Sequence, residues 1–229
     1  MWKRYLGLLR RFKPKEICRR GQLLHVGCGP ERLDGWVNID LQPFPSVDFV
    51  ADVTRGLPFQ DSEALFAEHF LEHLTLEEGL DFLTAAHGAL KPGSWLRLST
   101  PNLEWVIATH YRKAAPREEK IRDAFRVNRA FYAWGHRFLW NRSLLAEALA
   151  GVGFTGIRWC RYGESELPVF RGIERHELYE DNATLPHVLI VEAQRDVPRP
   201  ATLASLREAV IREFSQQPSI PPLAQGGDA

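Results

Sequence analysis

The sequence predicts an α/β protein with a mainly parallel sheet. Short apolar segments alternate with segments of helical spacing between residues 22 and 193, and this order is typical of parallel strands joined by helical crossovers. The first apolar segment, Leu23–Val26, runs directly into a Gly-x-Gly turn. Glycines at the carboxyl end of a first strand let a ligand approach the backbone closely.

The elements are expected in a regular order along the chain. Thr75 and Glu78 form a capping box, which predicts that a helix starts there. That helix is expected to run to about Leu90, where the sequence Lys-Pro-Gly over residues 91–93 ends it. Strands are expected at 23–26, 36–40, 47–50, 64–69, 95–100, 156–161 and 187–193, and further helices at 103–113, 117–134, 143–151 and 201–214.

Composition excludes several classes of protein. The chain has 229 residues, of which 45% are apolar and 25% charged, as in ordinary globular domains. No run of about 18 apolar residues predicts a membrane-spanning helix, and no signal-peptide pattern is present. The three cysteines, Cys18, Cys28 and Cys160, form no CxxC pair. This argues against structural zinc and predicts a cytoplasmic protein.

Charge divides the chain into parts. Residues 1–20 carry a net charge of +7, whereas the whole chain carries zero. Within them, residues 2–12 have amphipathic helical spacing, which fits a helix docked on the domain or a weak contact with an anionic membrane surface. Residues 21–196 are expected to form the main domain, and 197–229 a helix with a disordered tail. Because the main domain is mildly acidic, nucleic acid is not expected as a partner.

Acidic residues follow the next two expected strands, as a nucleotide-like ligand would require. Asp40 ends the second strand and suits a hydrogen bond to a ribose diol. Asp52 closes the third. Because the carboxyl ends of parallel strands meet at one edge of the sheet, Gly27, Asp40 and Asp52 are expected to share a binding rim.

With these residues in place, the sequence resembles the class I S-adenosylmethionine-dependent methyltransferases, in particular the broad group called type 11. The resemblance implies a Rossmann-like, seven-stranded, mainly parallel sheet with helices on both faces and an antiparallel last strand. It also implies S-adenosylmethionine as cofactor and a small-molecule or sugar-containing acceptor, covered by a helical cap over residues 103–140. It rests on segments 24–30, 37–41, 51–53, 57–59, 68–74, 90–93 and 96–102, and more loosely on 136–193.

The resemblance assigns cofactor roles to individual positions. Gly27 and Gly29 would face the methionine part, with a backbone contact from Cys28. Asp40, followed by Leu41, would hold the ribose, while Asp52 and the Val53 amide would read the adenine edge. Glu68 and His69 would lie beside the sulfonium.

One departure from the family is visible. Only ten residues separate Gly29 from Asp40, too few for a helix, a turn and a strand. The first helix is therefore expected to shrink to a turn, which removes a helix N-terminus that would favour the cofactor carboxylate. Arg32, or Arg19 or Arg20, is the expected substitute.

Histidines supply the candidate bases, since their pKa lies near working pH. His69 and His136 are the favoured catalytic residues, each with a structural role as the alternative. The expected acceptor contacts are Tyr111, Arg137, Arg171, Glu174 and His176.

Other functions stay open at this point. His69, Glu72 and His73 also fit H-x-x-E-H, the pattern of a zinc hydrolase. A few ubiquinone-type methyltransferases bind a divalent cation in this segment, which Glu68, Glu72 and His73 would permit, although no metal is assigned. A cofactor-binding module without methyl transfer, and chemistry other than methyl transfer, are the remaining alternatives. Methylation of an oxygen or nitrogen in a bacterial biosynthetic pathway is the favoured function.

Overall fold

A computed structural model of the chain describes residues 21–176, 184–196, 204 and 207–208. The expected N-terminal helix, and nearly all of the C-terminal helix and tail, lie outside the described residues.

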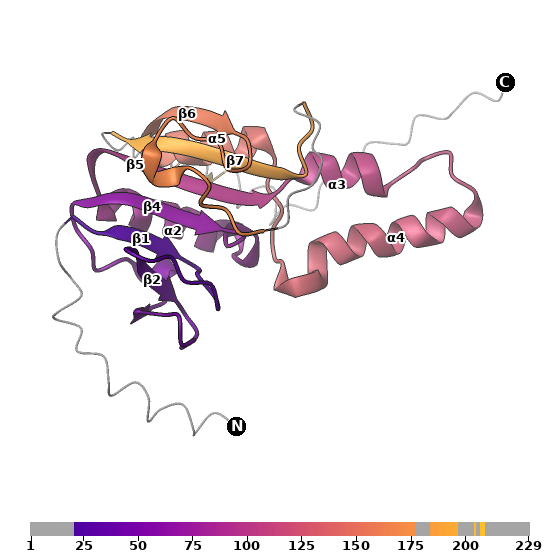
Figure 1. The fold of residues 1–229 in the computed structure, drawn as a ribbon. Coiled ribbons are helices and arrows are strands. Elements are labelled where there is room, and N and C mark those ends of the chain that lie inside the picture. The colour runs from indigo at the N-terminus through magenta and orange to yellow at the C-terminus, as the bar shows by residue number, and fades with distance from the viewer. Residues whose placement is uncertain (1–20, 177–183, 197–203, 205–206, 209–229) are drawn as a thin grey trace.

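The fold is a seven-stranded sheet with the order β3-β2-β1-β4-β5-β7-β6. Strands β1 to β5 run parallel, whereas β7 is antiparallel to both β5 and β6. This confirms the seven-stranded, mainly parallel, Rossmann-like sheet that the sequence predicts, including the antiparallel last strand (Figure 1). The strands are Leu23–Val26 (β1), Val37–Asp40 (β2), Phe49–Val50 (β3), Ser62–Glu68 (β4), Leu90–Pro101 (β5), Phe154–Cys160 (β6) and Val188–Arg195 (β7).

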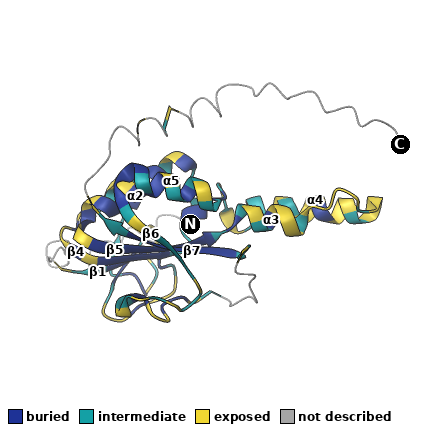
Figure 2. Ribbon diagram, turned by 90° about the horizontal axis from the view of Figure 1, so that it is seen from above, coloured by how far each residue is buried: buried dark blue, intermediate teal, exposed yellow. Residues whose placement is uncertain are grey.

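The two faces of the sheet are covered differently. Helices α2 (Leu76–Ala89) and α5 (Arg142–Val152) lie together on one face, as seen from above in Figure 2. Their apolar residues and the strands form the main core. A smaller core around Phe66 and Phe170 lies beneath loops and the short 3₁₀ helix η6 (Pro168–Phe170). The expectation of helices on both faces is therefore wrong for the described residues, in which α-helices cover only one face.

Local signals explain where α2 begins. The Thr75 hydroxyl accepts a hydrogen bond from the Glu78 N–H, and the Glu78 carboxylate accepts one from the Thr75 N–H at 2.8 Å. The helix does end near Leu90, but β5 starts there at once, so the expected Lys-Pro-Gly stop lies inside the strand. Gly93 adopts φ +81°, and its carbonyl accepts a hydrogen bond from Gln194 on β7.

The first crossover is short, as expected, and the Asn38 side chain makes several of the hydrogen bonds that hold it. Asn38 on β2 is fully buried. Its amide accepts from the Leu33 N–H and donates to the Leu33 and Trp36 carbonyls, at 2.9–3.1 Å. These bonds replace the backbone partners that a helix would supply.

A helical hairpin leaves the body after β5 and returns at Trp140. It consists of α3 (Leu103–His110), α4 (Arg117–Tyr132) and the 3₁₀ helix η5 (Ala133–Gly135). Asn102 pairs with Trp140 at its base. Figure 1 shows α4 projecting away from the sheet.

Candidate functional site

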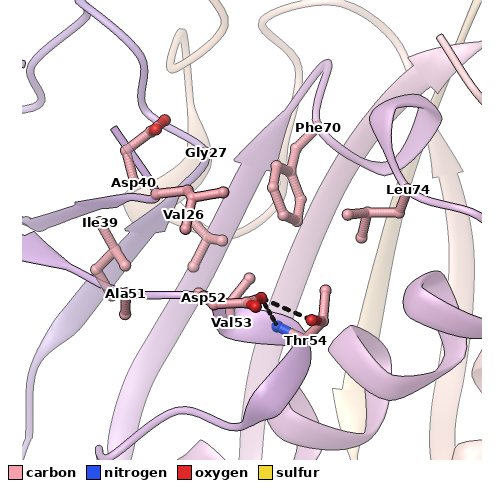
Figure 3. A pocket seen from close by; sticks show the side chains of 11 residues that line it. Val26, Gly27, Ile39, Asp40, Ala51, Asp52, Val53, Thr54, Phe70 and Leu74 are labelled. Atoms are coloured by element: carbon pink, nitrogen blue, oxygen red, sulfur yellow. Dashed lines mark hydrogen bonds between the residues drawn. The ribbon is translucent and has the colours of Figure 1, made fainter. Parts of the chain in front are cut away.

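A pocket lies at the carboxyl ends of β1 and β2. This is the edge of an open α/β sheet where ligands bind. Figure 3 shows Ile39 and Ala51 on one side of the pocket and Phe70 and Leu74 on the other. Five residues assigned to the cofactor from the sequence line it: Gly27, Asp40, Leu41, Asp52 and Val53.

The Gly-x-Gly turn is folded onto β2. The N–H groups of Gly27 and Cys28 both donate to the Ile39 carbonyl, at 2.9 and 3.2 Å. Gly27 has φ +67°, and a Cβ there would lie 2.4 Å from Phe70 Cδ2. At Gly29, with φ +53°, a Cβ would meet nothing within 4 Å. Phe70 therefore closes the pocket over Gly27, whereas the space over Gly29 is open.

Cys28 is buried beside the pocket and does not line it. Burial raises the pKa of its thiol to about 12. The thiol therefore stays protonated at neutral pH and is a poor nucleophile.

Asp40 is held in a fixed orientation by two backbone donors. Gly29 N–H donates to its Oδ2 at 2.9 Å, and Gln42 N–H donates to its Oδ1 at 2.8 Å. Each carboxylate oxygen can accept a second hydrogen bond. The Asp40 carboxylate can therefore still receive both hydroxyls of a diol.

Asp52 and Leu41 complete the rim in different ways. The Asp52 carboxylate caps the 3₁₀ helix η3 (Val53–Arg55), accepting from Thr54 N–H and Thr54 Oγ1 (Figure 3). Leu41 lines the pocket with 66% of its surface exposed. An exposed apolar side chain beside the Asp40 carboxylate offers a surface on which a planar ring can pack.

Arg32, the expected partner of the cofactor carboxylate, is engaged elsewhere. Its guanidinium donates to Asp48 Oδ1 at 2.8 Å and to the Ser46 carbonyl. Arg19 and Arg20 lie outside the described residues. The structure therefore assigns no partner to that carboxylate.

Glu68 and His176 form a pair at the end of β4. The Glu68 carboxylate accepts hydrogen bonds from the backbone N–H groups of Arg175 and His176 and from the His176 ring. Burial raises the pKa of Glu68, but these hydrogen bonds outweigh it and leave that pKa below its usual value. Glu68 is thus an anchor for the 175–176 loop.

His69 follows directly and belongs to a second pair. Its Nδ1 lies 2.8 Å from Glu72 Oε1, while Glu72 Oε2 accepts from the Thr100 hydroxyl. Burial lowers the pKa of His69, but the hydrogen bond and charge of the fully buried Glu72 outweigh it and leave the pKa raised. Because a carboxylate oxygen only accepts, Nδ1 carries the proton. Nε2 of the neutral ring is then free to accept one.

The segment 69–73 does not have the geometry of a zinc-protease helix. His69 adopts φ +46° and precedes the 3₁₀ helix η4 (Leu71–His73). The ring of His69 contacts His176, whereas that of His73 contacts His136, with centroids 5.3 Å apart. Two histidines that face different neighbours do not form the paired ligands of an H-x-x-E-H helix.

A different set of potential ligands does converge. Glu72, His73 and His136 each offer an atom within 4.8 Å of the other two. His136 Nδ1 donates to the Ala130 carbonyl at 2.9 Å, so its Nε2 is the atom available. His136 thus lies with His73 and not beside His69.

The remaining expected acceptor residues are scattered. Tyr111 is exposed at the end of α3, and Arg137 pairs with Glu78 at 2.5 Å. Arg171 donates to the loop carbonyls of Ser165 and Glu166. Glu174 is buried against Arg97. Of the five expected contacts, only His176 meets the candidate base His69.

Sequence reasoning missed Phe70 and Thr100. Phe70 directly follows the candidate base His69, but an aromatic residue at that position does not by itself predict a pocket contact. Thr100 orients Glu72 from the neighbouring strand. That contact depends on the register of β4 and β5, in which Glu68 lies opposite Ser99.

Among known proteins, similarity to this chain is found at the level of solved structures. No protein-family model matches the sequence, and no curated protein matches it. Among solved structures, a methyltransferase from Archaeoglobus fulgidus matches with 15% identity and a TM-score of 0.48, covering 84% of this chain and 91% of that chain. A possible histamine N-methyltransferase from Thermotoga maritima matches with 13% identity and a TM-score of 0.46; the match covers 85% of this chain and 95% of that chain. The CurJ carbon methyltransferase matches with 14% identity and a TM-score of 0.45, covering 84%; this chain spans only 52% of its length.

Proposed function

We propose that the protein is an S-adenosylmethionine-dependent methyltransferase acting on a small-molecule or sugar-containing acceptor. The observation that carries the proposal is the oriented Asp40 carboxylate at the rim of the pocket. Two backbone N–H groups fix it, and its remaining lone pairs suit a ribose diol.

The residues present fit the proposed cofactor. Apolar side chains of Ile39, Val53 and Leu74 wall the pocket, and Leu41 supplies an exposed apolar surface at the rim. The open space over Gly29 leaves room for a bound group close to the backbone. When bound, S-adenosylmethionine would supply an electrophilic methyl group attached to sulfur.

The protein's own contribution would be positioning and proton transfer. Methyl transfer is an in-line displacement, so holding the acceptor in line contributes much of the rate. For a hydroxyl or amine acceptor, His69 Nε2 would accept the proton that leaves. Glu72 fixes the Nδ1–H tautomer of His69 and stabilises the ring once it is charged.

The test is calorimetric titration with S-adenosylmethionine and S-adenosylhomocysteine. Wild type should bind both, and Asp40→Ala should weaken binding by at least about tenfold, since it removes charge-assisted hydrogen bonds to the diol. Asp34→Ala is the matched control, because the Asp34 side chain is fully exposed. Failure of the wild type to bind either compound overturns the proposal.

An acceptor screen separates the alternatives. Cofactor binding with methylated product supports the proposed activity, whereas tight binding without turnover over a broad panel indicates a binding module or other chemistry. Metal analysis of the purified protein tests the hydrolase hypothesis, which requires stoichiometric zinc. The convergence of Glu72, His73 and His136 makes that analysis worthwhile.

A further inference from the structure

Helix α4 is exposed almost throughout. Of its 16 residues only Asp123 is buried, and Figure 2 shows most of the helix as exposed. An isolated helix of this length is marginally stable in water. Because most of α4 is exposed, burial against the rest of the described chain contributes little to the stability of this helix.

One face of α4 is apolar. Ile121, Phe125 and Tyr132 are four and seven residues apart, which places them on one side of the helix. Their exposed fractions are 46%, 72% and 74%. Trp134, in η5 directly after the helix, is 66% exposed and has the Arg129 guanidinium 5.0 Å from its ring centre. Large apolar side chains are seldom gathered on a surface that water alone covers.

Basic residues flank this face without acidic partners. Of the three acids of α4, Glu119 and Asp123 are paired with Arg112, and Asp123 also with Arg126, while the exposed Glu118 has no ion pair to a described residue. Within the described part of the chain, four basic residues of α4 have no ion pair: Arg117, Lys120, Arg122 and Arg129. Residues 103–140 as a whole carry a net charge of +4, in a chain whose total is zero.

We propose that α4 and η5 dock on an anionic phospholipid surface. A helix with aromatic residues on one face and Arg or Lys beside them is the pattern of helices that lie in the membrane interface, and Trp and Tyr are enriched at that depth. The helix lies on the bilayer and does not cross it, since no helix among the described residues is long and apolar enough to span one. A second copy of the chain is disfavoured as the occupant, because two such faces carry the same positive charge.

The hairpin follows β5 at its carboxyl end, the edge of the sheet where the pocket also lies. Docking through α4 would therefore hold this edge near the lipid surface. The inference itself does not depend on the cofactor or on methyl transfer.

The test is flotation of the full chain with vesicles of phosphatidylcholine alone and with about 30% phosphatidylglycerol. Wild type should bind the anionic vesicles and not the neutral ones. Each basic side chain near an anionic surface contributes about fivefold in affinity. Arg122→Gln/Arg129→Gln should therefore bind about 25-fold more weakly, and Phe125→Ser/Tyr132→Ser should also bind more weakly in the same assay.

The matched control is Lys91→Gln/Arg142→Gln. It also removes two positive charges, and both residues lie outside the hairpin. Arg142 is stacked on Trp159 as Arg129 is stacked on Trp134, so the control also removes one such contact. Its binding should equal that of wild type. The proposal is overturned if the hairpin variant keeps wild-type affinity, as it would if residues 1–20 alone bound the vesicles.

A second measurement distinguishes lipid from a second copy. Lipids brominated on their acyl chains should quench wild-type tryptophan fluorescence more than that of Trp134→Phe. Equal quenching of the two proteins contradicts insertion of the hairpin. A change in oligomeric state in Phe125→Ser/Tyr132→Ser, with vesicle binding unchanged, identifies the face as an interface between copies and also overturns the proposal.

Discussion

The two halves of the sheet use charged side chains in opposite ways. On the parallel half, Asp40 and Asp52 are half-buried at the rim. Two backbone N–H groups hold Asp40, whereas Thr54 and the exposed Arg55 guanidinium hold Asp52. On the antiparallel half, Arg97, Glu174 and Glu192 are fully buried and paired with one another at 2.5–2.6 Å. The remaining oxygens are bound by the Gly163 N–H, which donates to Glu174, and by the Arg158 guanidinium, which donates to Glu192.

The difference shows how a site differs from a structural ion pair. A carboxylate that the protein itself satisfies completely has nothing to offer a ligand, whereas one held by two donors with lone pairs left over does. Glu174 and Asp40 are both acidic residues, and the type of residue alone does not distinguish them. Only the supply of partners separates their roles.

The largest expected effect comes from breaking the buried network. Arg97→Met leaves the Glu174 carboxylate buried without a cation, while Glu192 keeps only Arg158, so we expect it to lower the free energy of unfolding by about 3–5 kcal/mol. Arg171→Met, which alters an exposed arginine of the neighbouring loop, should change it by less than about 1 kcal/mol. Urea denaturation of both variants measures the difference, and equal losses would contradict a structural role for the network.

A smaller effect is expected in the glycine turn of the parallel half. Gly27→Ala and Gly29→Ala share the strain of positive φ, which is about 1–2 kcal/mol, but only the first places a Cβ against Phe70. We expect Gly27→Ala to be about 1–3 kcal/mol less stable than Gly29→Ala. Thermal melts of the two proteins test this, and equal melting temperatures would show that Phe70 moves aside at no cost.

The smallest expected effect concerns pH, at the junction of the halves. The pKa of His69 is raised in the folded protein, so its stabilising contribution is complete below about pH 6.5, the unfolded value. That contribution is lost as pH rises through the folded pKa. The test variant is His69→Asn, because asparagine tolerates positive φ. Its loss of folding free energy relative to wild type should be larger at pH 5.5 than at pH 9, by less than about 1 kcal/mol.

Urea titrations of wild type and His69→Asn at the two pH values isolate the contribution of His69 to the free energy of unfolding. The contributions of other titrating groups are the same in both proteins and cancel when the two are subtracted. A stability difference that does not vary with pH would mean that Glu72 does not stabilise the charged form of His69.

Local sequence signals predicted much of the fold. The capping box at Thr75 and Glu78, the strand before Gly27 and the ten-residue limit on the first crossover all depend on neighbours in the chain. Each appears in the structure. The errors are mainly at element ends, as at β5, where pairing with β7 extends the strand beyond its local pattern.

The sequence by itself determined the α/β class, the order of the elements and which residues stand at the strand ends, because periodicity and turn chemistry act over a few residues. Only the tertiary structure decided that Thr100 binds Glu72, that His136 meets His73 and that Glu174 is buried against Arg97. The partners of His136 and Glu174 lie 63 and 77 residues away in the chain. The order of the strands and the crossovers between them bring such residues together, and local sequence patterns do not predict contacts between residues so far apart in the chain.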